Sequence, residues 1–235
     1  MENPLFSVII TTKNEERYLE RTLRSIKNQT YKPIEIIVSD AKSTDGTLKI
    51  SKKFVDKIIL KKTNIPAGRN LGAKYARGKY LVFVDADCIL ARDWVEKSYS
   101  SFERENADLV NGSFEPIEKT MKAKIFIKVL NGARILSNIL GLSNVMGPGV
   151  VAIKKETFTR VRGYRENLAM AEEEDLGKRV NKIGKIFYER NCKARTSFRR
   201  MEKDGYLKWS FVWLLGYLMI VLGKKPITKT YRTIR

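Results

Sequence analysis

Two aspartates separated by a single residue, Asp85 and Asp87, are the residues of this sequence best suited to holding a metal ion. They follow directly after an apolar run at residues 80–84, which predicts a buried strand. Two carboxylates at a strand end can share a hard cation, which can bridge two phosphates and neutralise a diphosphate leaving group. A turn with helix-capping aspartates is the alternative, because aspartate is favoured in turns. The apolar run before the pair favours the metal site.

The absence of histidine narrows the possible chemistry. It excludes catalytic triads that need histidine and metal sites built on histidine. Carboxylates must therefore supply the metal ligands, and the expected ion is Mn²⁺ or Mg²⁺. The two cysteines, Cys88 and Cys192, form no closely spaced pattern, which argues against a disulfide framework or a zinc ribbon and favours a reducing compartment.

Polar residues also follow two other apolar runs. Thr11 and Thr12 end a run that begins at Phe6, and Asp40 follows the run at residues 34–38. Open α/β sheets bind ligands at the edge where the carboxyl ends of their parallel strands meet. We therefore expect these groups and the aspartate pair to share one crevice. Asp40 is suited to hydrogen bonding with a base or a ribose, although an ordinary loop aspartate explains it equally well.

Two further charged features have both a functional and a structural interpretation. Arg69 stands at an expected helix start after Pro-Ala-Gly, where it would face a phosphate or form a surface charge. One carboxylate of a later acidic cluster could act as a general base that takes the proton of an acceptor hydroxyl. The same cluster would also suit the first turn of a helix, and taken alone this second interpretation is favoured. The cluster is Glu172, Glu173, Glu174 and Asp175.

Strands and helices must alternate along the chain to position these residues. Short loops between them predict an α/β fold with a largely parallel sheet. A capping box is expected at residues 12–15, before a helix that contains Leu19, Leu23 and Ile26. The other expected elements are strands at residues 6–11, 34–38, 57–60, 80–84, 109–114 and 150–153, and helices at 48–54, 69–76, 94–102, 121–140 and 172–183.

Together these segments resemble, in order, the motifs of the family 2 glycosyltransferases, which have the GT-A fold. The resemblance covers about residues 5–200. It is specific because several motifs occur in sequence, although the Gln-x-x-Arg-Trp motif of processive synthases is absent. The matching segments are SVIITTKNE at residues 7–15, IIVSD at 36–40, STDGT at 43–47, GRNLG at 68–72, GKYLVFVDAD at 78–87 and EEEDLGKR at 172–179.

The resemblance implies a nucleotide-sugar donor, a divalent metal and inversion at the anomeric carbon. UDP is the first expectation for the donor nucleotide and GDP the next. Asp87 would bind the metal, and Asp85 would contact the metal or the ribose. The residues implied for nucleotide binding are Thr11, Thr12, Glu15, Asp40, Asp45, Arg69 and Asp85.

The acidic motif departs from the family pattern, which reads Glu-Asp, a spacer and Asp-Leu. Alignment on Asp175-Leu176 makes Glu173 the catalytic base, whereas alignment on Glu174-Asp175 makes Asp175 the base. We prefer Glu173 because residues 176–179 then fall in the usual frame. Glu172 stays a third candidate.

The resemblance also implies a domain organisation. Residues 1–200 would form a Rossmann-like GT-A domain, mainly a parallel sheet flanked by helices. Residues 1–115 would bind the nucleotide and residues 116–200 the acceptor. Residues 201–235 would form a helical appendage of amphipathic or hydrophobic character.

The apolar run at residues 209–223 is shorter than the ~20 residues that span a membrane. Its tryptophans, its tyrosine and the lysines on both sides favour peripheral contact with a membrane surface, and an ordinary packed helix is the alternative. If it docks, the acceptor would be a lipid phosphate or a lipid-linked glycan, and otherwise a glycan hydroxyl. The expected location is the cytoplasm, at the inner face of the cell membrane.

The formal net charge of +20 calls for an anionic partner or reflects a basic surface of a heat-adapted protein. A nucleic-acid-binding protein would carry exposed aromatics among its basic residues or a known binding motif, and neither is found. A nucleotidyltransferase would carry a Gly-rich loop after the first strand, where this sequence has Thr12-Lys13-Asn14-Glu15. We therefore expect no nucleic-acid partner. Arg199 and Arg200 are suited equally to phosphate contact and to the surface.

Overall fold

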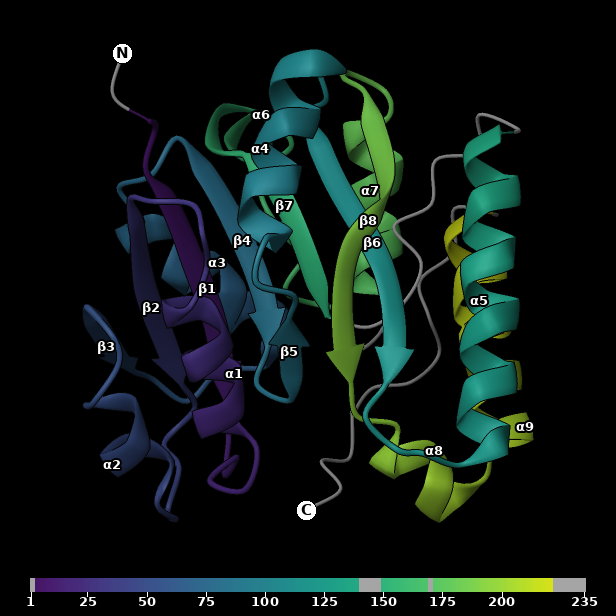
Figure 1. Ribbon diagram of the computed structural model, residues 1–235, viewed down its shortest axis with the longest axis horizontal. Coiled ribbons are helices and arrows are strands. Elements are labelled where there is room, and N and C mark those ends of the chain that lie inside the picture. The colour runs from purple at the N-terminus through teal and green to yellow at the C-terminus, as the bar shows by residue number, and fades with distance from the viewer. Residues whose placement is uncertain (1–2, 140–148, 169–170, 222–235) are drawn as a thin grey trace.

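The computed structural model describes residues 3–139, 149–168 and 171–221 (Figure 1). Its strands form one eight-stranded mixed sheet. They are β1 (Phe6–Thr12), β2 (Ile34–Asp40), β3 (Lys57–Leu60), β4 (Tyr80–Asp85), β5 (Cys88–Leu90), β6 (Leu109–Pro116), β7 (Val150–Lys154) and β8 (Ile186–Thr196). Their order across the sheet is β3-β2-β1-β4-β7-β6-β8-β5.

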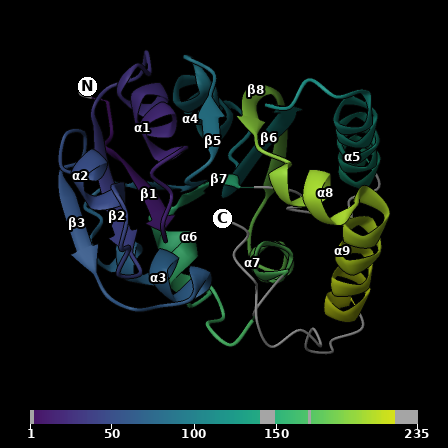
Figure 2. The ribbon, with the colours of Figure 1, turned by 90° about the horizontal axis from the view of Figure 1, so that it is seen from below.

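Helices cover both faces of this sheet (Figure 2). The first four are α1 (Leu19–Lys27), α2 (Thr47–Ser51), α3 (Ile65–Tyr75) and α4 (Trp94–Arg104). The others are α5 (Met121–Ile139), α6 (Lys155–Arg160), α7 (Glu172–Val180), α8 (Arg199–Asp204) and α9 (Tyr206–Val221). One core cluster joins the sheet to α1, α4 and α5, and a second joins it to α3, α6 and α7.

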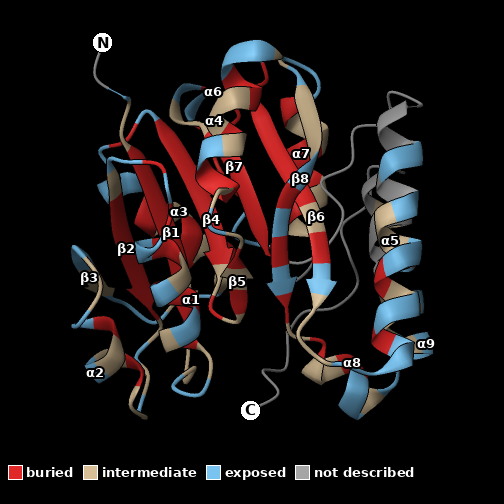
Figure 3. Cartoon of the chain, viewed as in Figure 1, coloured by how far each residue is buried: buried red, intermediate tan, exposed pale blue. Residues whose placement is uncertain are grey.

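The first strand shows why the sheet needs both layers. Phe6, Val8 and Ile10 point into one cluster and Ile9 into the other, and all four are fully buried. Successive side chains of a strand face opposite sides, so an uninterrupted apolar run must be covered twice. Figure 3 shows this burial along the neighbouring strands as well.

The strand register brings the expected polar residues to one edge. Strand β1 pairs in parallel with β2 and with β4, so that Thr12 lies opposite Asp40 and Thr11 opposite Asp85. The expectation that these strand ends meet is therefore confirmed.

The second half of the sheet contains antiparallel pairs. Strand β7 runs antiparallel to both β4 and β6, and β5 runs antiparallel to β8. Strands β6 and β8 are parallel to each other. The reversal at β7 places residue 149, which precedes this strand, beside the end of β4, since the Asp85 amide donates to the Gly149 carbonyl at 2.9 Å.

One local expectation was wrong, and one strand was not predicted. The capping box at residues 12–15 does not form, because the Thr12 hydroxyl donates to Asp40 at 2.7 Å and α1 begins only at Leu19. The basic segment after residue 185 is largely the strand β8, which pairs with β6 and β5 although many of its residues face solvent.

The C-terminal part of the described chain consists of α8 and α9. Met201 of α8 is buried in the main core, and Phe126 of α5 stacks edge-on against Tyr206 at 5.4 Å between ring centroids. Residues 222 and 223 of the expected docking segment lie outside the described residues. Within the described ranges, none of the helices is both long enough and apolar enough to cross a bilayer.

Glu35 offers a test of the sheet's packing at β2. Its buried carboxylate accepts hydrogen bonds from the Ser7 hydroxyl (2.5 Å) and from the backbone and side chain of Arg77 (2.6 and 2.8 Å). Burial alone would raise the pKa of Glu35, but these hydrogen bonds outweigh it and lower the pKa. A carboxyl with a lowered folded pKa stabilises the protein above its unfolded pKa, and this stability is lost as the pH falls through the folded pKa.

We expect Glu35→Gln to lower the free energy of unfolding by about 1–3 kcal/mol at neutral pH, because a buried charge-assisted network is broken. The difference from wild type should shrink as the pH falls below about 4. Urea unfolding at several pH values measures this. The exposed Glu115→Gln is the matched control and should change little. An equal loss at all pH values would contradict the role given to the charge.

Candidate functional site

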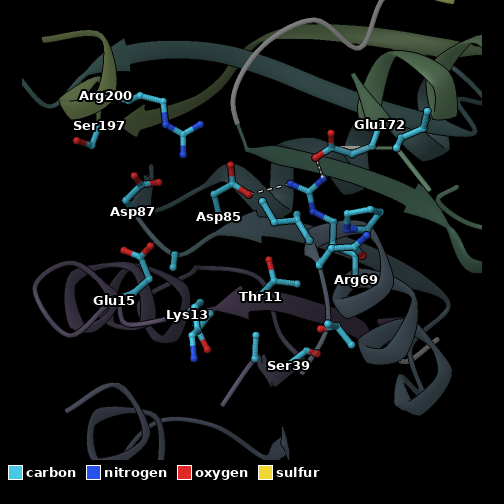
Figure 4. Close-up of a pocket in the computed structure, with 18 of the residues that line it drawn as sticks. Thr11, Lys13, Glu15, Ser39, Arg69, Asp85, Asp87, Glu172, Ser197 and Arg200 are labelled. Carbon is cyan, nitrogen blue, oxygen red and sulfur yellow. Dashed lines mark hydrogen bonds and ion pairs between the residues drawn. The ribbon is translucent and has the colours of Figure 1, made fainter. Parts of the chain in front are cut away.

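A cavity of about 850 Å³ opens at the edge where β1 and β4 end (Figure 4). Most of the residues expected there line it, but Asp40, Asp45, Glu173 and Asp175 do not. The expected residues in its wall are Thr11, Thr12, Glu15, Arg69, Asp85, Asp87 and Glu172. Basic side chains that also line it are Lys13, Lys42, Lys62, Arg199 and Arg200.

Arg69 of α3 joins the aspartate pair to the acidic cluster. Its side chain is only 4% exposed, and its guanidinium contacts Asp85 Oδ1 at 2.8 Å, Glu172 Oε1 at 3.2 Å and Glu173 Oε1 at 3.1 Å. Burial alone would lower the pKa of Arg69, but Tyr164 and these carboxylates raise it. The arginine therefore stays charged, and Asp85, Glu172 and Glu173 are held around one cation. Figure 4 shows Arg69 between Asp85 and Glu172.

Arg199 of α8 forms a second charged centre at the opposite wall. Its Nη2 lies 3.0 Å from each carboxylate oxygen of Glu15 and 3.5 Å from Asp87 Oδ2, and its guanidinium stacks on Tyr18 at 4.2 Å. Burial is the main cause that raises the pKa of Asp87, to about 7, and Asp85 adds to it while Arg199 opposes it. The sequence alone left Arg199 undecided between the cavity and the surface.

The residues at the end of β4 fit a divalent metal. Oxygens of Asp85 and Asp87 and the sulfur of Cys88 lie within 4.8 Å of one another. Carboxylate oxygens are the donors that Mg²⁺ and Mn²⁺ prefer, so the aspartates satisfy the expected ligand chemistry. Cys88 was not expected here, and its place beside Asp87 in the sequence was the only available indication.

Gly149 lies close to the side chains of Asp85 and Cys88. Its φ of +74° lies in the left-handed region, and a Cβ at this position would stand 2.6 Å from Asp85 Oδ2 and 2.8 Å from Cys88 Sγ. Only glycine fits both constraints without a shift of the carboxylate.

Asp40 lies behind the wall of the cavity. It is fully buried, and its carboxylate accepts from the Thr12 hydroxyl at 2.7 Å and from the hydroxyl and amide of Ser43 at 2.6 and 2.7 Å. These bonds connect the ends of β1 and β2. In this structure Asp40 thus fixes the strand end that carries Thr11 and Thr12.

Asp45 lies in the loop after β2, also outside the wall. Its carboxylate accepts from the amide and hydroxyl of Thr47 at 3.0 and 2.5 Å and from the Glu16 amide at 3.3 Å. Burial would raise the pKa of Asp45, but these hydrogen bonds lower it. The Thr47 hydroxyl in turn accepts from the Glu15 amide at 2.8 Å, so this loop positions Glu15.

The acidic cluster forms the first turn of α7, and its members face different surroundings. Glu172 lines the cavity, whereas Glu173 is mostly buried against Arg69. Burial is the main cause that raises the pKa of Glu173, with Arg69 opposing it. Asp175 forms ion pairs with Arg165 at 3.1 Å and Arg179 at 2.8 Å, which indicates a structural role.

Comparison with known proteins identifies relatives of this chain. The model of the family described as Glycosyl transferase family 2 matches residues 7–134. Glycosyltransferase GlyA of Streptococcus pneumoniae is 30% identical over 225 residues, a match that covers 93% of this chain and 29% of GlyA. The chain thus spans less than a third of the length of that relative.

Solved structures also resemble the fold, among them the following two. A mannosyltransferase of Pyrobaculum calidifontis, in complex with GDP-Man and Mn²⁺, superposes with a TM-score of 0.75 at 20% identity, covering 96% of this chain and 66% of that one. Residues 1–349 of TarS from S. aureus, in complex with UDP-GlcNAc, give 0.70 at 18% identity, covering 95% and 68%. These likenesses confirm the GT-A fold.

We expect Gly149→Ala to weaken Mn²⁺ binding roughly tenfold or more, because the new methyl group displaces the Asp85 carboxylate. The strained φ should also cost about 1–3 kcal/mol of stability. Mn²⁺ titration followed by electron paramagnetic resonance measures the affinity, and thermal unfolding measures the stability. Gly132→Ala on α5 is the control, because its Cβ would meet open space. If the Gly149→Ala protein folds and binds Mn²⁺ as tightly as wild type, Gly149 has no role in the metal site.

Proposed function

The chain belongs to glycosyl transferase family 2, and we propose that it transfers a sugar from a nucleoside diphosphate sugar bound in the cavity to an acceptor hydroxyl or a lipid phosphate. One observation carries the proposal. Residues of four separate motifs, Thr11, Arg69, Asp87 and Glu172, line a single cavity at the edge of the sheet. If the chain were a nucleotidyltransferase or a nucleic-acid-binding protein, neither this convergence of motifs nor the family membership would be explained.

The cavity suits an anionic donor. Lysines and arginines line it together with the aspartate pair, which favours a ligand carrying phosphates and a metal. UDP is the first candidate nucleotide and GDP the second. The S. aureus neighbour was solved with UDP-GlcNAc and the P. calidifontis neighbour with GDP-Man, so both nucleotides occur in this fold.

Asp85 and Asp87 would hold Mn²⁺ or Mg²⁺, which when bound neutralises charge on the diphosphate leaving group. Arg69 fixes the orientation of Asp85, and Arg199 balances the charge of Asp87 and Glu15. Arg199 and Arg200, which also line the cavity, would contact the diphosphate. Thr11, Thr12 and Glu15 would contact the nucleoside, while Asp40 and Asp45 support them from behind.

The proposed base is Glu173, which takes the proton of an acceptor hydroxyl. The acceptor oxygen then bonds to the anomeric carbon as the bond to the diphosphate oxygen breaks. This single displacement inverts the anomeric centre and needs no covalent intermediate. A carboxyl whose pKa is raised by burial, as that of Glu173 is, is better matched to proton transfer near neutral pH. Glu172, at the cavity wall, is the second candidate.

The domain division also belongs to this proposal. Residues 1–115 would bind the donor, residues 116–200 the acceptor, and the segment after residue 200 would act at the inner face of the cell membrane. The two free, buried cysteines agree with a reducing compartment.

Calorimetric titration of UDP, GDP and CDP, each with Mn²⁺ or with EDTA, tests the donor site. We expect one nucleotide to bind in a metal-dependent manner, and Asp87→Ala to abolish the metal-dependent part. Absence of binding by every nucleotide under both conditions would contradict the transferase proposal and favour a nucleic-acid partner for the basic surface.

Substitution within the acidic cluster tests the base. We expect Glu173→Gln to lower kcat by roughly 10²- to 10⁴-fold with nucleotide affinity retained, because the amide cannot accept the proton. The same substitution removes the ion pair with Arg69 and should also lower stability. Glu172→Gln should have a smaller effect, and Asp175→Asn should lower stability more than kcat. These rates require the acceptor to be known, so donor hydrolysis is the first readout. If Glu172→Gln shows the large loss instead, the base is Glu172.

A further inference from the structure

Exposed apolar side chains are concentrated on two helices. In the described part of the chain, eight of the eleven large hydrophobic residues with exposed side chains belong to α5 or α9. On α9 they are Leu207 (87% exposed), Phe211 (66%) and Leu215 (39%). On α5 they are Met121, Ile125, Val129, Ile135 and Leu136. Such concentration is unusual for a surface that faces only water.

The spacing of these residues makes each set one helix face. Leu207, Phe211 and Leu215 recur every four residues, as do Met121, Ile125 and Val129, which aligns each set along its helix. The opposite face of α5 is in the core through Ala123 and Ile127. The exposed stripes are therefore additional to the faces that hold the helices in the fold.

The two helices lie on the same flank of the molecule, beyond β6 and β8 (Figures 1 and 2). The contact between Phe126 and Tyr206 joins α5 to the start of α9. We call the exposed faces of these two helices the α5–α9 surface. Exposed lysines lie on or next to these helices, namely Lys122, Lys124 and Lys128 on α5, Lys203 on α8 and Lys208 on α9.

We propose that the α5–α9 surface docks on a lipid bilayer that carries anionic headgroups. Apolar side chains would enter the boundary between headgroups and acyl chains, and the lysines would remain among the headgroups. A water-soluble acidic protein would match the lysines but would not need two exposed apolar stripes. Within the residues that the structure describes, neither helix is long and apolar enough to span the bilayer.

Helix α9 and the helix before it, α8, form part of the cavity wall. Met201 of α8 and Trp209 of α9 line the cavity, and the Arg200 guanidinium lies 5.1 Å from the Trp209 ring. Docking would thus hold the donor cavity next to the membrane surface. Given the proposed function, on which this step rests, the acceptor is a lipid-borne group presented from that surface.

Co-sedimentation with vesicles tests the docking surface on the whole chain. The vesicles are phosphatidylcholine alone, or phosphatidylcholine mixed with phosphatidylglycerol. The variants are the α9 pair Leu207→Glu with Phe211→Glu and the α5 pair Ile125→Glu with Val129→Glu. Leu60→Glu, on the far edge strand β3 and also exposed (57%), is the matched control. Circular dichroism and nucleotide calorimetry establish that each variant folds and keeps its donor site.

We expect wild type and Leu60→Glu to bind the mixed vesicles and to bind pure phosphatidylcholine much more weakly. Each pair of substitutions should weaken partitioning roughly tenfold or more, because two apolar side chains no longer enter the bilayer. Equal binding by wild type and both paired variants would overturn the proposal, since net charge alone would then account for the binding. A failure of wild type to bind the mixed vesicles would also overturn it. If wild type is a dimer and the α9 pair of substitutions dissociates it, the surface binds a second copy of the chain instead. Nucleotide binding that persists in any of these cases leaves the transferase proposal standing.

Discussion

The guanidinium of Arg69 lies almost fully buried among the carboxylates of Asp85, Glu172 and Glu173. Buried carboxylates that close to one another repel strongly unless a cation separates them. Breaking such a group by removing one partner leaves uncompensated buried charge, which costs about 3–5 kcal/mol. The arginine also lies over the Tyr164 ring at 5.1 Å, which fixes its plane. The end of β4 and the start of α7 can approach each other only because this cation lies between them.

A second layer of hydrogen bonds makes that edge rigid. Asp40 connects the ends of β1 and β2, and the loop after β2 binds the loop after β1 through Asn14, Glu15 and Glu16. Side chains that would otherwise rotate freely at loop positions are thereby held in one orientation. Residues that position others can be as important to a site as those that touch the ligand.

The sequence alone was sufficient for the features that depend on neighbouring residues. Apolar runs identified β1, β2 and β4, and parallel pairing then required Thr11, Thr12 and Asp85 to meet. It was insufficient where a contact joins distant segments. Glu15 and Arg199 are separated by 184 residues, and no local pattern connects them. The capping box failed for the same reason, because Asp40 on another strand competes for the Thr12 hydroxyl. Strand β8 was missed because its half-exposed sequence resembles a surface segment.

The ion pair between Glu15 and Arg199 joins residues that are synthesised at different times. A growing polypeptide emerges from the ribosome from its N-terminus, and earlier segments can begin to fold first. Strands β1, β2 and β4 need nothing beyond residue 85 for their mutual pairing. Glu15 and Asp87, however, lack the cation of α8 until residue 199 has been made. The wall that contains Arg199 is therefore added after the sheet edge, and an unfinished chain presents Glu15 and Asp87 without the guanidinium that pairs with them.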